Sequence, residues 1–180
     1  MTTMMTTTAK RASDTFDVSI AKSTLGLVLI AGSDAGVAAV LLGDERADLR
    51  ADLARRFPRA TLRDAGNKSA AVVARVVKAI DGATTDAAST IPLDLRGTEF
   101  QRAVWRALRA IPRGSTATYS EIAARIGQPG AARGVAQACA ANPVAVLVPC
   151  HRVVRADGAL SGYRWGIERK RALLERESAA

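Results

Sequence analysis

The sequence has few of the residues that bind metals or form disulfides. It contains two cysteines, Cys139 and Cys150, and one histidine, His151. A structural zinc site takes about four cysteine or histidine ligands, so we expect no metal site. Two cysteines are also too few for the disulfide framework of a small secreted protein. Free thiols suit a reducing compartment, and we therefore expect a cytoplasmic protein.

Long hydrophobic runs are also lacking. No apolar stretch approaches the roughly 20 residues that a membrane-spanning helix needs, so we expect no membrane partner. Residues 1–13 are rich in threonine, and their charges, Lys10 and Arg11, come late. A secretory signal has its positive charge first and an apolar stretch after it. We therefore interpret residues 1–13 as a disordered tail.

What is present is an ordinary globular composition with an uneven charge. The 180 residues are 48% hydrophobic and 24% charged, which suits one domain or two small ones. Residues 1–97 carry 13 Lys/Arg and 11 Asp/Glu, a net +2, whereas residues 98–180 carry 13 and 6, a net +7. This excess indicates a polyanionic partner such as DNA or RNA for the second half. Charge alone leaves a basic protein without such a partner equally possible.

The first half, residues 14–89, is typical of a mixed α/β scaffold domain. Short apolar or alternating segments separated by Gly, Ser and Asp predict an antiparallel meander with strands at 16–21, 25–31 and 37–42. Apolar residues at helical spacing predict helices at 44–57 and 69–80. We expect a small-residue linker at 82–89 and a further strand at 91–95. Nothing in this half has a catalytic pattern.

The second half, residues 90–180, is predicted to be mostly helical. Thr98 and Thr118 each begin a capping-box pattern, so a helix should start after each of them. The second of these helices is followed by a Gly-containing turn at 127–130 and another helix at 131–141, which is the outline of a helix-turn-helix. A hairpin turn at 155–160 and a closing helix at 168–177 complete the prediction.

The predicted helix at 131–141 is unusual for a reader of DNA sequence. Seven of its positions are Ala or Gly, and its only long polar side chains are Arg133 and Gln137. Such a helix can approach the sugar-phosphate backbone closely and bind the minor groove by shape, with one long side chain as a wedge. The alternative is an alanine-rich helix packed inside a bundle, which is a commoner use of such a sequence.

Cys150, His151 and Arg152 form the most specific group in the sequence. A thiolate is a strong nucleophile, but a free thiol has a pKa of about 8.5 and stays mostly protonated at neutral pH. His151 is the adjacent base and Arg152 adds positive potential. An acidic side chain is needed to orient the imidazole, and the closing helix offers Glu168, Glu175 and Glu177. The alternative is a buried, inert cysteine, which we expect of Cys139 in its alanine-rich helix.

Residues 148–154 read VPCHRVV, and this segment resembles the active-site signature of O6-alkylguanine-DNA alkyltransferases. Further matching segments lie between Phe100 and Glu177, namely Tyr119-Ser120, residues 129–133, Ala141-Asn142-Pro143, Ser161-Gly162-Tyr163 and Leu173-Leu174. Residues 41–44 and 92–97 more loosely resemble the alkyltransferase portion of Ada-type proteins, so about 165 residues are covered. We find no counterpart of the zinc-binding and transcription-activating parts of Ada-type proteins, and therefore expect no regulatory role.

The resemblance implies an α+β fold. An N-terminal α/β, ribonuclease H-like domain with a small antiparallel sheet would precede a mostly helical, winged helix-turn-helix-like domain. It also implies a methylated-DNA–[protein]-cysteine S-methyltransferase that acts once on O6-alkylguanine in double-stranded DNA, as a monomer and without a cofactor. O4-alkylthymine is left open as a second substrate. The lesion lies inside the base stack, so the nucleotide has to be flipped out.

The resemblance further assigns roles to individual residues. Cys150 accepts the alkyl group, His151 takes its proton through a water, and Glu177 orients His151. Asn142 braces the turn before the signature, and Tyr119 binds the guanine ring and helps to protonate it. Arg133 holds the gap left by the flipped nucleotide, and the other residues at the DNA are Gln137, Ala131, Ala132 and Tyr119. Main-chain groups near Cys150 and Val153 and the loop around Tyr163 and Arg164 line the base pocket, to which Cys139 is also assigned.

Two other functions compete with alkyl transfer. A lesion sensor, or another DNA-binding protein without chemistry, can share this fold, but alkyltransferase-like sensors lack the acceptor cysteine that Cys150 supplies here. A cysteine hydrolase using Cys150 and His151 would need an oxyanion hole. It would also leave the basic, alanine-rich helix without an explanation.

Overall fold

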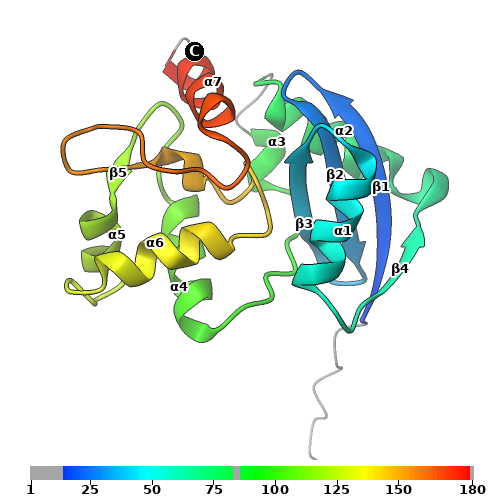
Figure 1. The fold of residues 1–180 in the computed structure, drawn as a ribbon, viewed down its shortest axis with the longest axis horizontal. Coiled ribbons are helices and arrows are strands. Elements are labelled where there is room, and N and C mark those ends of the chain that lie inside the picture. The colour runs from blue at the N-terminus through cyan, green and yellow to red at the C-terminus, as the bar shows by residue number, and fades with distance from the viewer. Residues whose placement is uncertain (1–13, 83–85, 179–180) are drawn as a thin grey trace, which may run out of the picture.

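The structure, a computed structural model, describes residues 14–82 and 86–178. The tail predicted at 1–13 lies outside these residues. Figure 1 shows two halves side by side: an N-terminal half (14–89) built on a sheet and a C-terminal half (90–178) built mostly of helices. This is the α+β fold that the sequence predicts, while the boundary between residues 89 and 90 stays a prediction.

The N-terminal sheet has the strand order β3-β2-β1-β4. Its strands are β1 (Thr15–Ser23), β2 (Gly26–Ser33), β3 (Gly36–Gly43) and β4 (Thr61–Asp64). The first three form the predicted antiparallel meander, but β4 pairs in parallel with β1, so the sheet is mixed rather than wholly antiparallel. The sequence does not predict β4, because only one of its four residues is even partly buried and it lacks an apolar alternation.

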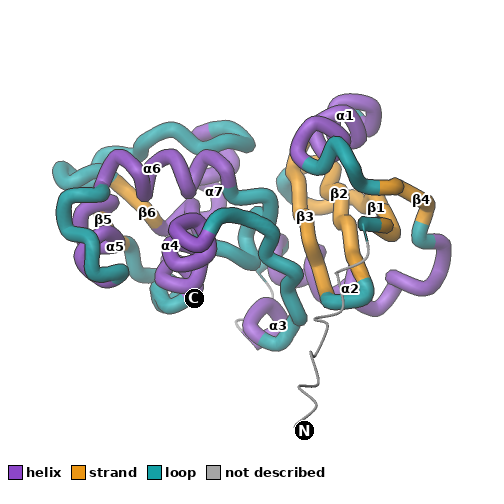
Figure 2. The backbone as a smooth tube through the Cα atoms, turned by 90° about the horizontal axis from the view of Figure 1, so that it is seen from below, coloured by secondary structure: helices purple, strands orange, loops and turns teal. Residues whose placement is uncertain are grey.

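Helices cover both faces of this sheet (Figures 1 and 2). The helix α1 (Arg46–Arg56) packs on β2 and β3 through Leu49 and Leu53. On the other face, α2 (Ala70–Ile80) follows the short 3-10 helix η1 (Gly66–Ser69) and packs on β1. The predicted linker at 82–89 is wrong in part, because Asp86–Ser89 forms the short helix α3.

Two segments of the C-terminal half cover the outer edge of β3. Their four backbone hydrogen bonds, each 2.9 Å long, are Val37 N to Pro92 O, Asp94 N to Val37 O, Val40 N to Pro143 O, and Ala145 N to Val40 O. Gly36 permits the first approach, since its φ is 141° and a Cβ there would lie 2.5 Å from Pro92 O. The strand predicted at 91–95 is therefore wrong. The segment makes only an isolated bridge at Leu93, next to a proline that has no N–H to donate.

The C-terminal half contains the predicted helices. They are α4 (Glu99–Arg109), α5 (Tyr119–Arg125), α6 (Ala132–Ala141) and α7 (Ile167–Ser178). Both capping boxes are formed, at Thr98 and at Thr118, so α4 and α5 begin where the sequence predicts. The helices α5 and α6 pack on each other across a tight turn, which confirms the helix-turn-helix outline.

A two-stranded sheet joins the helix-turn-helix to the cysteine segment. Its strands, β5 (Ala117–Thr118) and β6 (Val153–Val154), pair in parallel. The turn at Asp157-Gly158 is present, with Gly158 N donating to Arg155 O, but β6 pairs with β5 and not in the expected hairpin. Within the described ranges, no helix is long and apolar enough to cross a membrane.

Candidate active site

A strained turn places Cys150 after α6. Asn142 ends α6 and is fully buried, and its Nδ2 donates to Val148 O at 2.9 Å and to Cys150 Sγ at 3.3 Å. Its Oδ1 accepts from Val144 N at 2.9 Å. Between these contacts lies Val146 with a φ of 67°, a conformation that β-branched residues rarely adopt and that costs about 1–3 kcal/mol. The hydrogen bonds of Asn142 on both sides of the turn stabilise this conformation.

Cys150 lines a cavity of about 640 Å³ and is itself 5% exposed. The cavity brings it together with four residues expected at the base, Tyr119, Cys139, Tyr163 and Arg164. All residues that line this cavity belong to the C-terminal half, and most of them come from α6 or from the loop between β6 and α7. A purine base fits the size and partly apolar character of such a space.

Val153 is the one predicted pocket residue that does not line the cavity. It lies in β6, where pairing with β5 accompanies complete burial of its side chain. Its carbonyl oxygen accepts a hydrogen bond of 2.6 Å from Lys170 Nζ. The sequence signature includes Val153 because it follows Cys150 closely, but the strand pairing directs it into the core.

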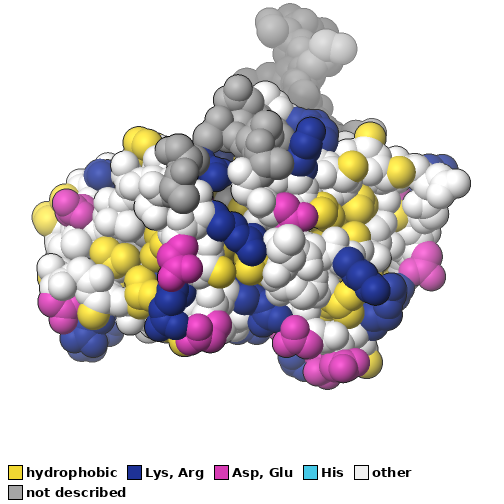
Figure 3. Space-filling model, turned by 90° about the horizontal axis from the view of Figure 1, so that it is seen from above, with side chains coloured by type: hydrophobic (Ala, Val, Ile, Leu, Met, Phe, Trp, Pro, Cys, Tyr) yellow, Lys and Arg dark blue, Asp and Glu magenta, His cyan; other side chains and the backbone are white. Residues whose placement is uncertain are grey.

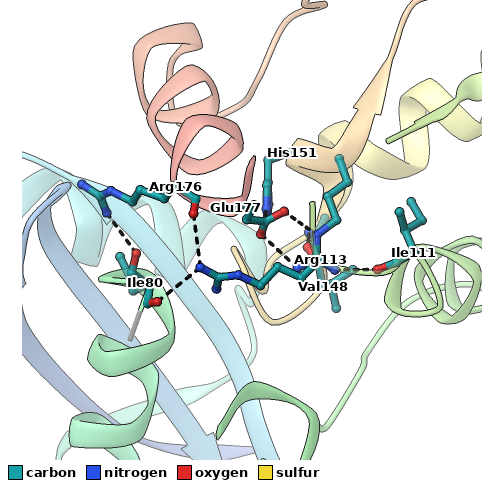
Figure 4. A network of polar contacts seen from close by, with 10 residues as sticks. Ile80, Ile111, Arg113, Val148, His151, Arg176 and Glu177 are labelled. Carbon is teal, nitrogen blue, oxygen red and sulfur yellow. Dashed lines mark hydrogen bonds and ion pairs between the residues drawn. The ribbon is translucent and has the colours of Figure 1, made fainter. Parts of the chain in front are cut away.

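His151 is fully buried and faces Glu177 of α7 (Figure 4). Its Nε2 lies 2.8 Å from Glu177 Oε1. Burial lowers the pKa of His151, although the hydrogen bond and charge of Glu177 oppose this, so the ring is neutral. Burial acts to raise the pKa of Glu177, but hydrogen bonds from His151 and Arg152 outweigh it and lower that pKa to about 2.

These two protonation states define the histidine tautomer. An ionised carboxylate can only accept, so Nε2 of His151 carries the proton and Nδ1 keeps its lone pair. Nδ1 is buried and has no hydrogen-bond partner among the described residues. Nδ1 is therefore the nitrogen of His151 that can accept a proton, and the carboxylate of Glu177 lies where it would stabilise an imidazolium.

Arg152 acts on the carboxylate and not on the thiol. Its Nε and Nη2 bind the two oxygens of Glu177 at 2.9 Å each, and its Nη1 donates to Ile111 O at 2.6 Å. A bidentate pair of this kind holds both position and charge of the carboxylate. The expectation that Arg152 adds positive potential at Cys150 is therefore wrong, because its guanidinium is directed to Glu177.

The helical spacing of α7 decides which of its acidic residues reaches His151. Lys170, Leu173 and Glu177 are its buried residues and share one face. The other two candidates, Glu168 and Glu175, are exposed. Sequence analysis missed Lys170, which is only 1% exposed, because a lysine among the many charges of this helix has no distinguishing pattern.

Burial raises the pKa of the Cys150 thiol to about 11. The hydrogen bond from Asn142 and the positive charges of Lys170 and Arg56 act in the opposite direction but are outweighed. The thiol is therefore protonated at neutral pH in the free protein. A thiolate forms only if a base takes this proton, and the neighbouring His151 is a neutral imidazole with an unpartnered Nδ1 among the described residues. Burial raises the pKa of Cys139 even further.

Tyr119 begins α5 and contacts the loop that closes the cavity. Its Oη forms a hydrogen bond with Ser161 Oγ. Burial raises the pKa of the Tyr119 phenol, although the bond to Ser161 opposes this, so the hydroxyl is protonated at neutral pH. Ser161 was not among the expected site residues, since a serine beside glycine is typical of any loop.

The helix α6 has one packed and one exposed face. Val135 and Ala138 are buried, and the carbonyl of Ala138 accepts from Trp105 Nε1 of α4 at 2.9 Å. Arg133 and Gln137 are exposed on the opposite face. Ala131, which precedes the helix, and Ala132, which begins it, are half-buried. The helix is thus both a packed alanine-rich element and a surface with two long polar side chains.

The surface around α7 has mixed charge. Seen from above, it carries Lys/Arg and Asp/Glu side chains next to one another (Figure 3). Ion pairs such as Arg171–Glu168 and Arg169–Asp44 account for part of this mixture. A polyanion would be attracted more weakly here than by unpaired arginines.

The N-terminal half contacts the site through α1. Asp52 binds Arg164 of the cavity at 2.9 Å and Arg56 at 3.1 Å. Arg56 Nη1 also points to the carbonyl oxygens of Ala141 and Asn142, at 3.4 and 3.5 Å. The half that we interpreted as a scaffold therefore holds both the end of α6 and one wall of the cavity.

Comparison with known proteins identifies relatives along nearly the whole chain. Residues 99–179 match the family described as 6-O-methylguanine DNA methyltransferase, DNA binding domain. The bifunctional transcriptional activator/DNA repair enzyme Ada of Escherichia coli (strain K12) is 48% identical over 159 residues, which are 88% of this chain and 44% of the relative. The inducible methylated-DNA–protein-cysteine methyltransferase of Bacillus subtilis (strain 168) is 42% identical over 126 residues, 70% of this chain and 69% of the relative.

A solved structure agrees with these matches. The crystal structure of Mycobacterium tuberculosis OGT in complex with DNA aligns with a TM-score of 0.73 at 38% identity and covers 92% of this chain and 93% of that one. The chain spans less than half the length of the Ada protein, but more than two thirds of the Bacillus enzyme. Taken with the geometry around Cys150, these matches establish that the chain belongs to the methylated-DNA–protein-cysteine methyltransferase family.

Proposed function

We propose that this chain repairs DNA by transferring the alkyl group of O6-alkylguanine to Cys150 Sγ. The observation that carries the proposal is a thiol on a cavity large enough for a base, followed in sequence by a histidine whose Nδ1 has no hydrogen-bond partner among the described residues. The pairing of that histidine with an ionised Glu177 supports its role as proton acceptor. Family membership supports the same reaction.

The reaction is a displacement at the alkyl carbon. His151 takes the thiol proton through a water, the S–C bond forms, and the bond from carbon to O6 breaks, with its electron pair passing to the guanine. Tyr119 donates its phenolic proton to the guanine ring, so that the base leaves neutral. The thioether is stable, and each molecule is consumed by a single transfer. No cofactor takes part.

Double-stranded DNA containing O6-alkylguanine is the proposed partner. The exposed face of α6 suits the minor groove, where Arg133 fills the gap left by the flipped nucleotide and Gln137 contacts the backbone. Ala131 and Ala132 allow close approach because they have no long side chains. The net +7 of residues 98–180 and the DNA complex of the mycobacterial relative support this partner. We propose that the chain acts as a monomer in the cytoplasm.

A mass measurement tests the proposal. The protein is mixed with an excess of duplex DNA containing one O6-methylguanine, and its intact mass and the peptide containing Cys150 are analysed. One methyl group per molecule, located on Cys150, is expected. An undamaged duplex and the Cys150→Ser variant serve as controls and should add nothing. Multiple turnovers on an ester or amide would instead identify a cysteine hydrolase.

One observation favours a second function, a lesion sensor without chemistry. Cys150 is only 5% exposed and burial raises its pKa, so the alternative is a protein that binds the lesion and leaves the thiol unreacted. Such a protein would bind the methylated duplex more tightly than the undamaged duplex and keep its mass. The same experiment therefore separates the two functions.

A further inference from the structure

Lys170 is a buried cation with no acidic partner among the residues that the structure describes. It is 1% exposed, and its Nζ contacts the carbonyl oxygens of Val153 at 2.6 Å and Ser161 at 3.4 Å, and Ser161 Oγ at 3.3 Å. In the described part of the chain, no carboxylate lies within 4.0 Å of this ammonium. Burying an ammonium without a counter-ion is costly, so packing alone is a poor explanation for a lysine at this position.

The contacts of Lys170 continue to the cavity. Ser161 Oγ, which accepts from Lys170, also forms the hydrogen bond with Tyr119 Oη, and Tyr119 and Ser161 both line the cavity. Side chains from α7, from the loop before it and from α5 thus form one chain of hydrogen bonds, from the ammonium of Lys170 through the hydroxyl of Ser161 to the phenol of Tyr119. The phenol is the last member before the space that a base would occupy.

We propose that Ser161 and Lys170 are positioning residues that act through Tyr119 on the departing guanine. This inference rests on the proposed function. When the bond from carbon to O6 breaks, Tyr119 gives its proton to the guanine ring. Ser161 gives its hydroxyl proton to the phenolate, and Lys170 gives one of its ammonium protons to Ser161. The guanine leaves neutral, Tyr119 and Ser161 end in their starting protonation states, and Lys170 ends as an amine that solvent reprotonates.

Ser161 is the better residue to substitute in a test of this proposal. Lys170 also places its charge close enough to lower the pKa of Cys150, so replacing it changes the nucleophile as well as the leaving group. Ser161 is neutral, and its removal should leave the thiol largely as it is. Ser161→Ala deletes the link, whereas Ser161→Thr keeps a hydroxyl at the same place.

Two methyl donors separate a leaving-group effect from a structural one. O6-methylguanine in a duplex and methyl iodide both convert Cys150 to S-methylcysteine, but iodide departs without needing a proton. Rates are measured by mass on the full chain, with protein in saturating excess over the DNA. With DNA, Ser161→Ala should react about tenfold more slowly than wild type, less than the roughly 100-fold or more of a direct general acid, because Ser161 acts through Tyr119. Ser161→Thr should recover most of the rate. With methyl iodide, all three should react alike.

Several outcomes would overturn the proposal. If Ser161→Ala transfers the methyl group from DNA as fast as wild type, Ser161 is not part of a proton relay. If its rate falls equally with DNA and with methyl iodide, Ser161 only supports the structure. Lys170→Met should slow both reactions, and a wild-type rate on DNA would remove Lys170 from the relay. A wild-type protein that reacts with methyl iodide but gains no methyl from DNA would refute the proposed function itself.

Discussion

The two halves of the molecule contribute to the site in different ways. Every residue that lines the cavity of Cys150 belongs to the C-terminal half, in the region that also carries most of the net positive charge. The N-terminal half is nearly neutral and supplies the apolar core of a sheet. It nevertheless holds the turn before Cys150 at the edge of β3 and reaches the cavity through Asp52. The difference teaches that reactive groups can be confined to one domain while their positions depend on both.

Several hydrogen bonds between the halves are made to backbone carbonyl oxygens. Arg176 donates to Ile80 O at 3.1 Å, and Arg113 donates to Gly82 O at 3.2 Å (Figure 4). Contacts of this kind depend on the path of the partner chain more than on its side chains. Substitutions in the N-terminal half should therefore disturb the site less than substitutions in the C-terminal half, and four variants test this order.

Cys150→Ala should have the largest effect. Without the sulfur there is no acceptor, so methyl transfer from duplex O6-methylguanine should be abolished, while DNA affinity stays close to that of wild type. Mass spectrometry measures the first and fluorescence anisotropy the second. Cys139→Ala is the matched control, because it removes the other thiol of the cavity and should still gain its methyl group on Cys150. Residual transfer to the Cys150→Ala variant would refute the assignment.

Glu177→Gln should rank second, with transfer slowed about 100-fold, because His151 loses the carboxylate that orients it and stabilises its charged form. Single-turnover rates measure this loss. Glu175→Gln, on the exposed side of the same helix, should react like wild type. Equal rates for the two variants would show that the buried pair has no part in the transfer.

The same variant should change the acid stability. The pKa of Glu177 is about 2 in the folded protein against an ordinary 4.5, so its contribution is complete above pH 4.5 and is lost as the pH falls toward 2. The difference corresponds to about 3 kcal/mol. His151, whose pKa lies below its ordinary 6.5, adds a loss that begins as the pH falls below 6.5. Urea unfolding across this range should give a shallower decline for Glu177→Gln between pH 4.5 and 2.

Arg133→Ala should slow repair of a duplex by about tenfold, because the flipped-out state loses the side chain that fills its gap. Reaction with the free base O6-methylguanine needs no flipping and should be unchanged. Arg106→Ala, an exposed arginine on α4, controls for the loss of one positive charge. If duplex and free base slow equally, Arg133 does not act as a wedge.

Asp52→Asn, in the N-terminal half, should have the smallest effect. It releases Arg164 and Arg56, and a partly exposed ion pair is worth about 1 kcal/mol at most, so transfer should slow by no more than about fivefold. Asp48→Asn, exposed on the same helix, is the control. If the transfer rate of Asp52→Asn fell as far as that of Glu177→Gln, the expected order of the two halves would be wrong, because the N-terminal half would then contribute directly to the reaction.

Local sequence patterns predicted most of the helices and strands. The capping boxes at Thr98 and Thr118 depend on residues three positions apart, so they can be recognised without knowing the fold. The three strands of the meander carry their own apolar pattern and their own turns. The short parallel strand β4 and the isolated bridge at Leu93 carry no such pattern, because each exists only through its partner in space.

The sequence by itself determined the elements, the helix-turn-helix outline and the motif around Cys150, because interactions between near neighbours in the chain encode them. Only the tertiary structure decided that Glu177 and not Glu175 faces His151, that Arg152 binds this carboxylate, and that burial keeps the thiol protonated. It also brought Tyr119, Ser161 and Lys170 into one chain of hydrogen bonds. These features depend on desolvation and on contacts between distant segments, which exist only once the helices have packed.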